Sequence, residues 1–451
     1  MADNPTQSHT TVGTFSVVSH DDIVAASNDV FNRPDIEVEE IEDVFTIEVA
    51  GMDWDIGAVR YQPKNDASIA VGADGRRVGI HLLHGGAGDF KTMHERAHLL
   101  ASKFGFCVVT GTFPGRFNFD DPNRDWPGDT IHSDGSVRTP LWQRGEHVTP
   151  DQYDVIEDDT MRARYGRRTV ARARPGSRFQ DRLGASPIAM ESACRTTMER
   201  HFPTDEFSIY VHGHSTGGPL QFMMSQRVPN IVGVLAAEHS AFGYINQAKH
   251  RWGGSPMRTD VFDELYVRTW RDLARYMGIE ALGTQGAEAL RRLPWLMEDV
   301  LDAWDEERIR PQFKCEYPVT WNIVDALEAA ARHTATRLNF DEAQTLELVQ
   351  TYLGLAYELR GPSAKPVPNV LFGISTNSRD HRPEVYEEVI LPMFAEMQPA
   401  PRVTVTRYEA GMHDYSTPEQ DLPMGIAPAI FTSWNDAIMN GYFVDTEPEA
   451  T

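Results

Sequence analysis

The chain has 451 residues, 41% of them hydrophobic and 24% charged, which is an ordinary composition for a globular protein with a sizeable core. Its formal net charge is −24, from 66 acidic and 42 basic side chains. This excess would repel a phosphate backbone and argues against a nucleic-acid partner. Three scattered cysteines do not make a disulfide framework or a zinc site, and no run of about 18 apolar residues predicts a membrane span. With no secretory-signal pattern at the start, we expect a cytoplasmic protein with no membrane partner.

The first elements in chain order predict an arm, a hairpin and a strand that enters a glycine-rich loop. Residues 1–43 are polar and then acidic, and we expect an N-terminal arm. From position 44 apolar residues alternate with polar ones, which predicts a half-buried strand, and residues 58–63 are its hairpin partner. Residues 78–88 (VGIHLLHGGAG) predict a strand and loop. A helix should follow, because one apolar stripe recurs at helical spacing: Phe90, Met93, Ala97, Leu100 and Phe104.

Further strands and helices alternate along the rest of the chain. A helix should open at Ser186–Pro187, with serine as N-cap and proline in the first turn. A second helix should begin after Thr216. Strands are expected at 106–113, 208–213, 231–240, 369–375 and 402–411. This alternation predicts an α/β fold with a mostly parallel central sheet and helices on both faces.

Two long insertions interrupt this pattern. The first, 114–184, is polar and has eight arginines between Arg162 and Arg182, which indicate either a solvated loop with surface ion pairs or a contact with an anion or another subunit. The second, 243–366, has helical periodicity throughout and predicts a helical cap inserted late in the sheet. We therefore expect a core formed by 1–242 and 367–451.

The segment Ser208–Leu220, SIYVHGHSTGGPL, places Ser215 where a strand gives way to a helix. Such a sharp turn brings neighbouring backbones close together, so only small residues fit two positions before and after the serine, as Gly213 and Gly217 do. The positive end of the following helix would stabilise an anion there. The pattern predicts a nucleophile elbow.

With HGG at His84–Gly86, GHSTG at Gly213–Gly217 and GMHDYS at Gly411–Ser416, the chain resembles the α/β-hydrolase superfamily from about Val44 to Tyr442. The resemblance implies the order serine, acid, histidine along the chain. His413, in the loop after the last predicted strand, is then the base, and Asp380, after the penultimate strand, is the acid. Glu238 is the alternative acid, because some members carry it one strand earlier. The main-chain N–H groups of Thr216 and of Gly86 or Ala87 would form the oxyanion hole.

A second motif, HERAH at His94–His98, matches the H-E-x-x-H pattern of zinc peptidases. Both histidines fall off the apolar stripe of their predicted helix, and no third ligand is apparent. We therefore predict no metal, and the expected chemistry needs no cofactor.

These features predict a serine hydrolase that cleaves a carboxylic ester or lactone of a small to medium hydrophobic molecule through an acyl-enzyme. Aromatic residues of the cap would line an apolar pocket for that substrate. Three alternatives stay open: hydrolysis of a C–C bond next to a carbonyl, acyl transfer to another acceptor, and a non-catalytic ligand receptor on the same fold. The sequence also leaves a homo-oligomer open.

Overall fold

The computed structural model describes residues 12–49, 51–84, 91–111, 168–174, 177–214, 228–238, 366–377, 399–412 and 414–444. It also describes parts of 142–158, 217–225 and 335–346, and positions 114 and 391. The predicted cap 243–366 therefore lies almost entirely outside the described residues.

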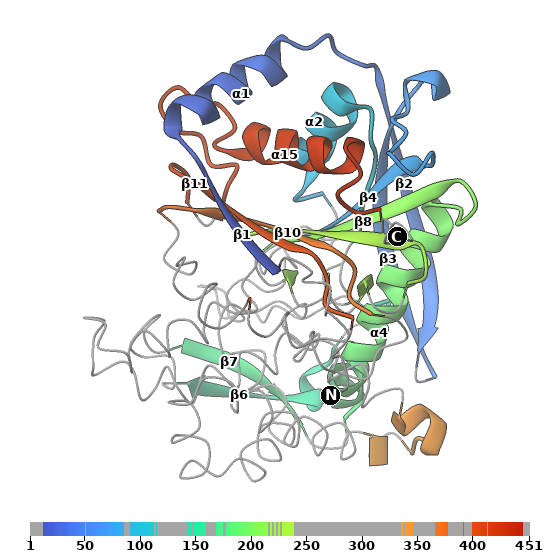
Figure 1. The fold of residues 1–451 in the computed structure, drawn as a ribbon. Helices are drawn as coiled ribbons and strands as arrows, with labels where there is room; N and C mark the ends of the chain where they lie inside the picture. The colour runs from blue at the N-terminus through green and yellow to red at the C-terminus, as the bar shows by residue number, and fades with distance from the viewer. Residues whose placement is uncertain are drawn as a thin grey trace, which may run out of the picture.

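Nine strands form one twisted sheet (Figure 1), in the order β1-β11-β10-β9-β8-β4-β5-β3-β2. Their bounds are β1 (Val12–Val18), β2 (Val38–Val49), β3 (Met52–Pro63), β4 (Arg77–Leu83), β5 (Cys107–Gly111), β8 (Phe207–Gly213), β9 (Ile231–Ala237), β10 (Val370–Ser375) and β11 (Val403–Tyr408). The pairs β2–β3 and β3–β5 are antiparallel and all the others are parallel. From β2 to β11 this is the strand order of the α/β-hydrolase fold, so the predicted fold is confirmed.

Helices cover both faces of this sheet (Figure 1). On one face lie α1 (His20–Asn32), α2 (His94–Phe104) and α15 (Ala427–Met439), and α4 (Arg178–His201) packs on the other. Two 3-10 turns, η1 (Asp66–Ser68) and η3 (Pro150–Gln152), are also described. Every residue of β8 and β10 is buried, as expected for central strands covered on both sides. No helix among the described residues is both long and apolar enough to cross a bilayer.

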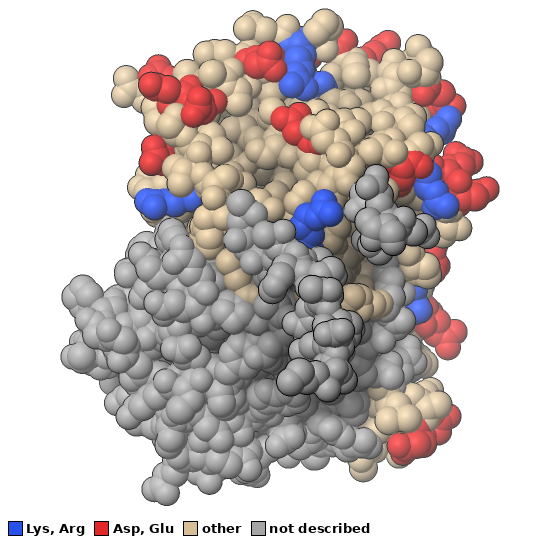
Figure 2. All heavy atoms as spheres, in the orientation of Figure 1, with Lys and Arg blue, Asp and Glu red and all other residues tan. Residues whose placement is uncertain are grey.

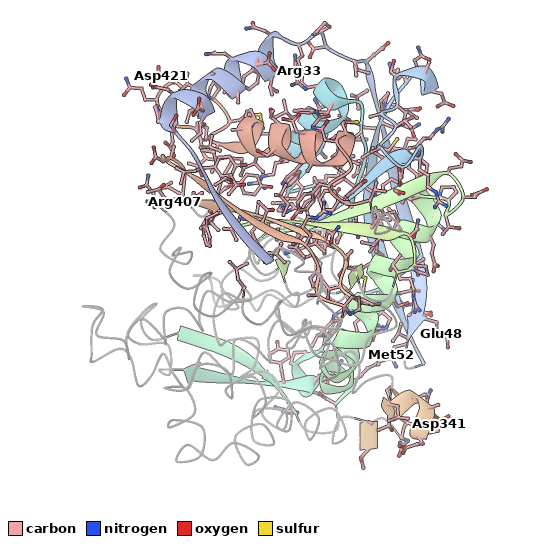
Figure 3. The ribbon with its side chains drawn as sticks, in the orientation of Figure 1. Arg33, Glu48, Met52, Asp341, Arg407 and Asp421 are labelled. Carbon is pink, nitrogen blue, oxygen red and sulfur yellow. The ribbon has the colours of Figure 1, made fainter. Side chains whose placement is uncertain are left out.

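The described part of the predicted N-terminal arm belongs to the sheet and to its helical layer. β1 pairs in parallel with β11 and becomes the outermost strand, and α1 packs on α15. The side chain of Ser19 caps α1 by accepting a hydrogen bond from the Asp22 N–H. β2 begins at Val38, six residues earlier than its alternating pattern suggests, and runs into the hairpin whose end carries Glu48 and Met52 (Figure 3).

The other edge strand, β2, is strongly acidic on its exposed side. Glu39, Glu40 and Glu42 are exposed, and acidic side chains are prominent among the charges on the face that Figure 2 shows. Such charges on an edge strand oppose pairing with a further strand. Part of the acidic excess of the sequence therefore protects this edge of the sheet from pairing with another strand.

The first insertion contains more regular structure than its polar sequence suggests. β6 (Tyr153–Asp158) and β7 (Arg168–Ala173) form a separate antiparallel pair, in which Asp154 is opposite Arg172 and Asp158 opposite Arg168. The following helix, α4, begins at Arg178, so the prediction that it opens at Ser186–Pro187 is wrong.

Arg182 explains why α4 extends into the insertion. Its side chain is fully buried, with the guanidinium carbon 4.7 Å from the ring centre of Trp54 and 5.8 Å from that of Trp142. It donates to Glu146 and to the main-chain carbonyl of Asp53. For this arginine the prediction of a solvated loop is wrong, because Arg182 is buried and ties the segment around Trp142 to β3.

Replacing Arg182 with methionine should therefore destabilise the protein by about 1–3 kcal/mol, the cost of leaving buried acceptors without their donor. The methionine keeps apolar packing between the two tryptophans. Urea unfolding followed by tryptophan fluorescence measures the change. The matched control is Arg178→Met, since Arg178 also binds Glu146, at 2.6 Å, but is exposed. Equal losses for the two variants would contradict the role given to Arg182.

Candidate active site

The carboxyl end of β8 makes the close backbone approach predicted for the elbow. A Cβ atom at Gly213 would overlap the main chain of Gly217, and one at Gly217 would lie 2.9 Å from the carbonyl oxygens of Leu83 and His84. The Gly217 N–H donates to the His214 carbonyl at 2.8 Å, and described residues from 218 to 225 are helical. A strand, a tight turn and a helix thus meet where the sequence predicts them, and only glycine fits at the two positions.

The elbow is also bound to its neighbours. The side chain of Gln221, in the helix after the turn, accepts from the Gly213 N–H at 2.8 Å, and the His214 N–H donates to the Leu83 carbonyl at 3.1 Å. Because Leu83 is the last residue of β4, the elbow packs directly beside the start of the glycine-rich loop. Ser215 and Thr216, and Gly86 and Ala87 of that loop, lie outside the described residues.

Glu238, the alternative acid, lies at the carboxyl end of β9 and is fully buried. Its φ of 50° is in the left-handed region, which costs a non-glycine residue roughly 1–2 kcal/mol. Its Oε1 atom accepts from the Ser375 N–H at 2.5 Å and from the Ser375 hydroxyl at 2.7 Å. A strained backbone that points a buried carboxylate at defined donors is typical of functional positions.

The same hydroxyl links Glu238 to the loop that carries His413. Ser375 Oγ lies 3.0 Å from the carbonyl oxygen of Met412, the residue that precedes His413. Glu238, at the end of β9, and Met412, after β11, therefore both contact Ser375 at the end of β10. His413 and Asp380 lie outside the described residues, so Glu238 is the one predicted catalytic residue whose surroundings can be described.

On the other side of position 413, the loop is buried against β8. Tyr415 is fully buried, and its hydroxyl donates to Nε2 of His212 at 2.9 Å. Nδ1 of His212 donates to the Leu235 carbonyl at 2.7 Å. Arg96 of α2 donates to Asp414 and Ser416 and stacks over the Tyr415 ring at 4.7 Å. Although burial opposes it, the charge of Arg96 lowers the pKa of Asp414 below its usual value.

Sequence reasoning did not find this second group of residues. His212 precedes the elbow glycine and has the appearance of an ordinary strand residue, and Arg96 lies inside the HERAH motif. Tyr415 stands two positions after His413 within the quoted GMHDYS segment, which was the one available signal.

The two histidines of the HERAH motif lie off the buried side of α2, as predicted. His94 and His98 are both exposed, and Nδ1 of His94 lies 3.1 Å from the Tyr61 hydroxyl. Within the described part of the chain, no group of three or more His, Cys, Asp or Glu side chains is arranged to hold a metal ion.

Comparisons with known proteins find similarity to solved structures alone. No protein-family model matches the chain, and no curated protein sequence matches it. Among solved structures it is similar to a hydrolase from Legionella pneumophila (13% identity, 95% of this chain and 96% of that chain, TM-score 0.40). It is also similar to a lipase in an open form (12%, 89% and 100%, TM-score 0.38) and to an acetyl xylan esterase from Thermoanaerobacterium (14%, 91% and 93%, TM-score 0.34). Similarity at these scores carries no argument, so the assignment of the fold depends on the strand order alone.

Proposed function

We propose that the protein is a serine hydrolase that cleaves a carboxylic ester or lactone through an acyl-enzyme. Ser215 attacks the carbonyl carbon, and His413 accepts its proton and returns it to the leaving oxygen. Water, activated by the same histidine, then cleaves the acyl-enzyme. The main-chain N–H groups of Thr216 and of Gly86 or Ala87 stabilise the oxyanion. This chemistry uses no metal and no cofactor.

One observation carries the proposal. The contacts of Ser375 with Glu238 and Met412 bring a buried carboxylate to the loop of the expected base, at the sheet edge where the elbow ends β8. A carboxylate next to an imidazole holds the correct tautomer and stabilises its charged form. We therefore assign the acid to Glu238 and keep Asp380 as the alternative.

The fold supports this order of residues. Successive parallel strands carry their functional loops at the same edge, so the ends of β8, β9 and β11 lie close together although they are far apart in the sequence. The expected substrate is a small to medium hydrophobic molecule, held under the predicted cap 243–366.

Labelling with a fluorophosphonate tests the nucleophile. We expect one covalent adduct per chain, and peptide mapping should place it on the peptide that contains Ser215. Ser215→Ala should not react, whereas Ser208→Ala, in the same strand but away from the elbow, should react like the wild type. An unlabelled wild type, or an adduct that persists in Ser215→Ala, would contradict the proposal. A panel of esters, lactones and β-diketones then separates ester cleavage from C–C cleavage.

A further inference from the structure

The loop that follows β11 makes contacts on both sides of position 413. The groups that contact it come from β8, β10 and α2, which also adjoin the other parts of the proposed site. Ser375 Oγ lies 3.0 Å from the Met412 carbonyl before this position, and Tyr415 and Arg96 act after it. The reaction needs His413 within hydrogen-bond reach of Ser215, so the contacts that hold this loop bear directly on the proposed chemistry.

The first contact is the buried hydrogen bond from Tyr415 to His212. Nδ1 of His212 lies 2.7 Å from a carbonyl oxygen, which can only accept, so Nδ1 carries the proton and Nε2 must accept from Tyr415. Burial lowers the pKa of His212 to about 3, so this ring stays neutral and keeps its acceptor at neutral pH. The bond therefore has one direction, and it joins the residue two positions after His413 to the residue three positions before Ser215.

The second contact is Arg96, which touches three consecutive residues of the loop. It donates to the Asp414 carboxylate and the Ser416 hydroxyl, and its guanidinium lies over the Tyr415 ring. The arginine side chain is only 7% exposed and that of Asp414 is 52% exposed, so the donor is shielded from solvent whereas the carboxylate is not. Arg96 belongs to α2, the helix that follows the glycine-rich loop. It therefore connects the loop that carries His413 to the helix next to the loop expected to bind the oxyanion.

Other packing supports the same arrangement. The ring of Tyr415 meets that of His214 edge-on with centroids 5.5 Å apart, and His212 lies 4.9 Å from the Trp434 ring of α15. The β8 side of the contact is therefore buried and packed against aromatic rings. Displacing a catalytic group by about 1 Å costs of the order of 100-fold in rate.

On the basis of the proposed function, we propose that Tyr415, His212 and Arg96 form a clamp that sets the distance between His413 and Ser215. They are positioning residues, because none of them is assigned contact with the substrate. The clamp acts on kcat, since it governs proton transfer between two enzyme groups, and leaves substrate binding nearly unchanged.

Tyr415→Phe tests the clamp by removing one oxygen atom and keeping the ring. With p-nitrophenyl butyrate we expect kcat to fall about 10- to 100-fold and KM to change less than twofold, with fluorophosphonate labelling slowed by the same factor as kcat. The matched control is Tyr408→Phe. Tyr408 is also a buried tyrosine, and its hydroxyl donates to one side chain, Ser433, at 2.9 Å. This variant should lose comparable thermal stability and keep the wild-type kcat.

Arg96→Lys provides a second test should Tyr415→Phe not fold. Lysine keeps the charge but lacks the planar guanidinium that lies over the Tyr415 ring, so kcat should fall about 3- to 10-fold at constant KM. Folded variants with the wild-type kcat, or an equal loss of kcat in Tyr408→Phe, would overturn the clamp. A Ser215→Ala variant that still turns over the ester would instead overturn the proposed function, so the two failures are distinguishable.

Discussion

Replacing Glu238 with glutamine should lower kcat by about 1,000- to 10,000-fold and leave KM within a few-fold of its wild-type value. The amide is nearly isosteric and keeps an oxygen that can accept from Ser375. It has lost the negative charge that stabilises the imidazolium formed when His413 takes the serine proton. The effect therefore belongs to the transition state and should appear in kcat. Steady-state kinetics on p-nitrophenyl butyrate measure it.

Two further variants make this result decisive. Glu409→Gln is the matched control, because Glu409 follows β11 by one residue but is exposed, and it should keep the wild-type kcat. Asp380→Asn should cost less than tenfold. If Asp380→Asn caused the large loss and Glu238→Gln the small one, the acid would lie after β10 as first predicted, and the assignment of Glu238 would be wrong.

The central fold could be predicted from the sequence because the evidence for it is local. Strands covered on both faces need continuous apolar runs, such as the buried β4 and β8, and each run ends in glycine or polar residues. The elbow was predictable for the same reason. Gly213 is required by its contact with Gly217, four residues later, and only the contacts of Gly217 with Leu83 and His84 come from a distant part of the chain.

The parts that sequence reasoning missed depend on partners far away in the chain. β1 lies in a segment whose polar and acidic surroundings predicted an arm, and it becomes a strand by pairing with β11, almost 400 positions later. The start of α4 is stabilised by Arg182, which lies between two tryptophans. Pro187 lies inside the helix, although proline is common at the first position of a helix and therefore predicted a start there. The assignment of the acid had the same difficulty, because only the contact of Ser375 with residues 238 and 412 distinguishes Glu238 from Asp380.

The protein should lose stability steeply as the pH falls below about 6.5, because three histidines are buried in their neutral form. Burial lowers the pKa of His81 and of His212 to about 3, and that of His201 to about 4. The unfolded chain binds protons at these sites near pH 6.5, and the folded chain does not. Their contribution is therefore complete above pH 6.5 and is lost as the pH falls towards 4 and then 3. At pH 5 each site should have lost about 2 kcal/mol, or about 6 kcal/mol together.

His81 offers the cleanest test of this linkage. Its side chain is fully buried in β4, and neither ring nitrogen has a hydrogen-bond partner among the described residues, so a leucine can replace it without removing a bond. His81→Leu should reduce the difference in unfolding free energy between pH 7.5 and pH 5 by about 2 kcal/mol. His20→Gln, at an exposed histidine, should leave that difference unchanged. Urea unfolding at both pH values measures it. A His81→Leu variant with the full wild-type difference would show that His81 is already protonated in the folded protein, against the effect that its burial should have.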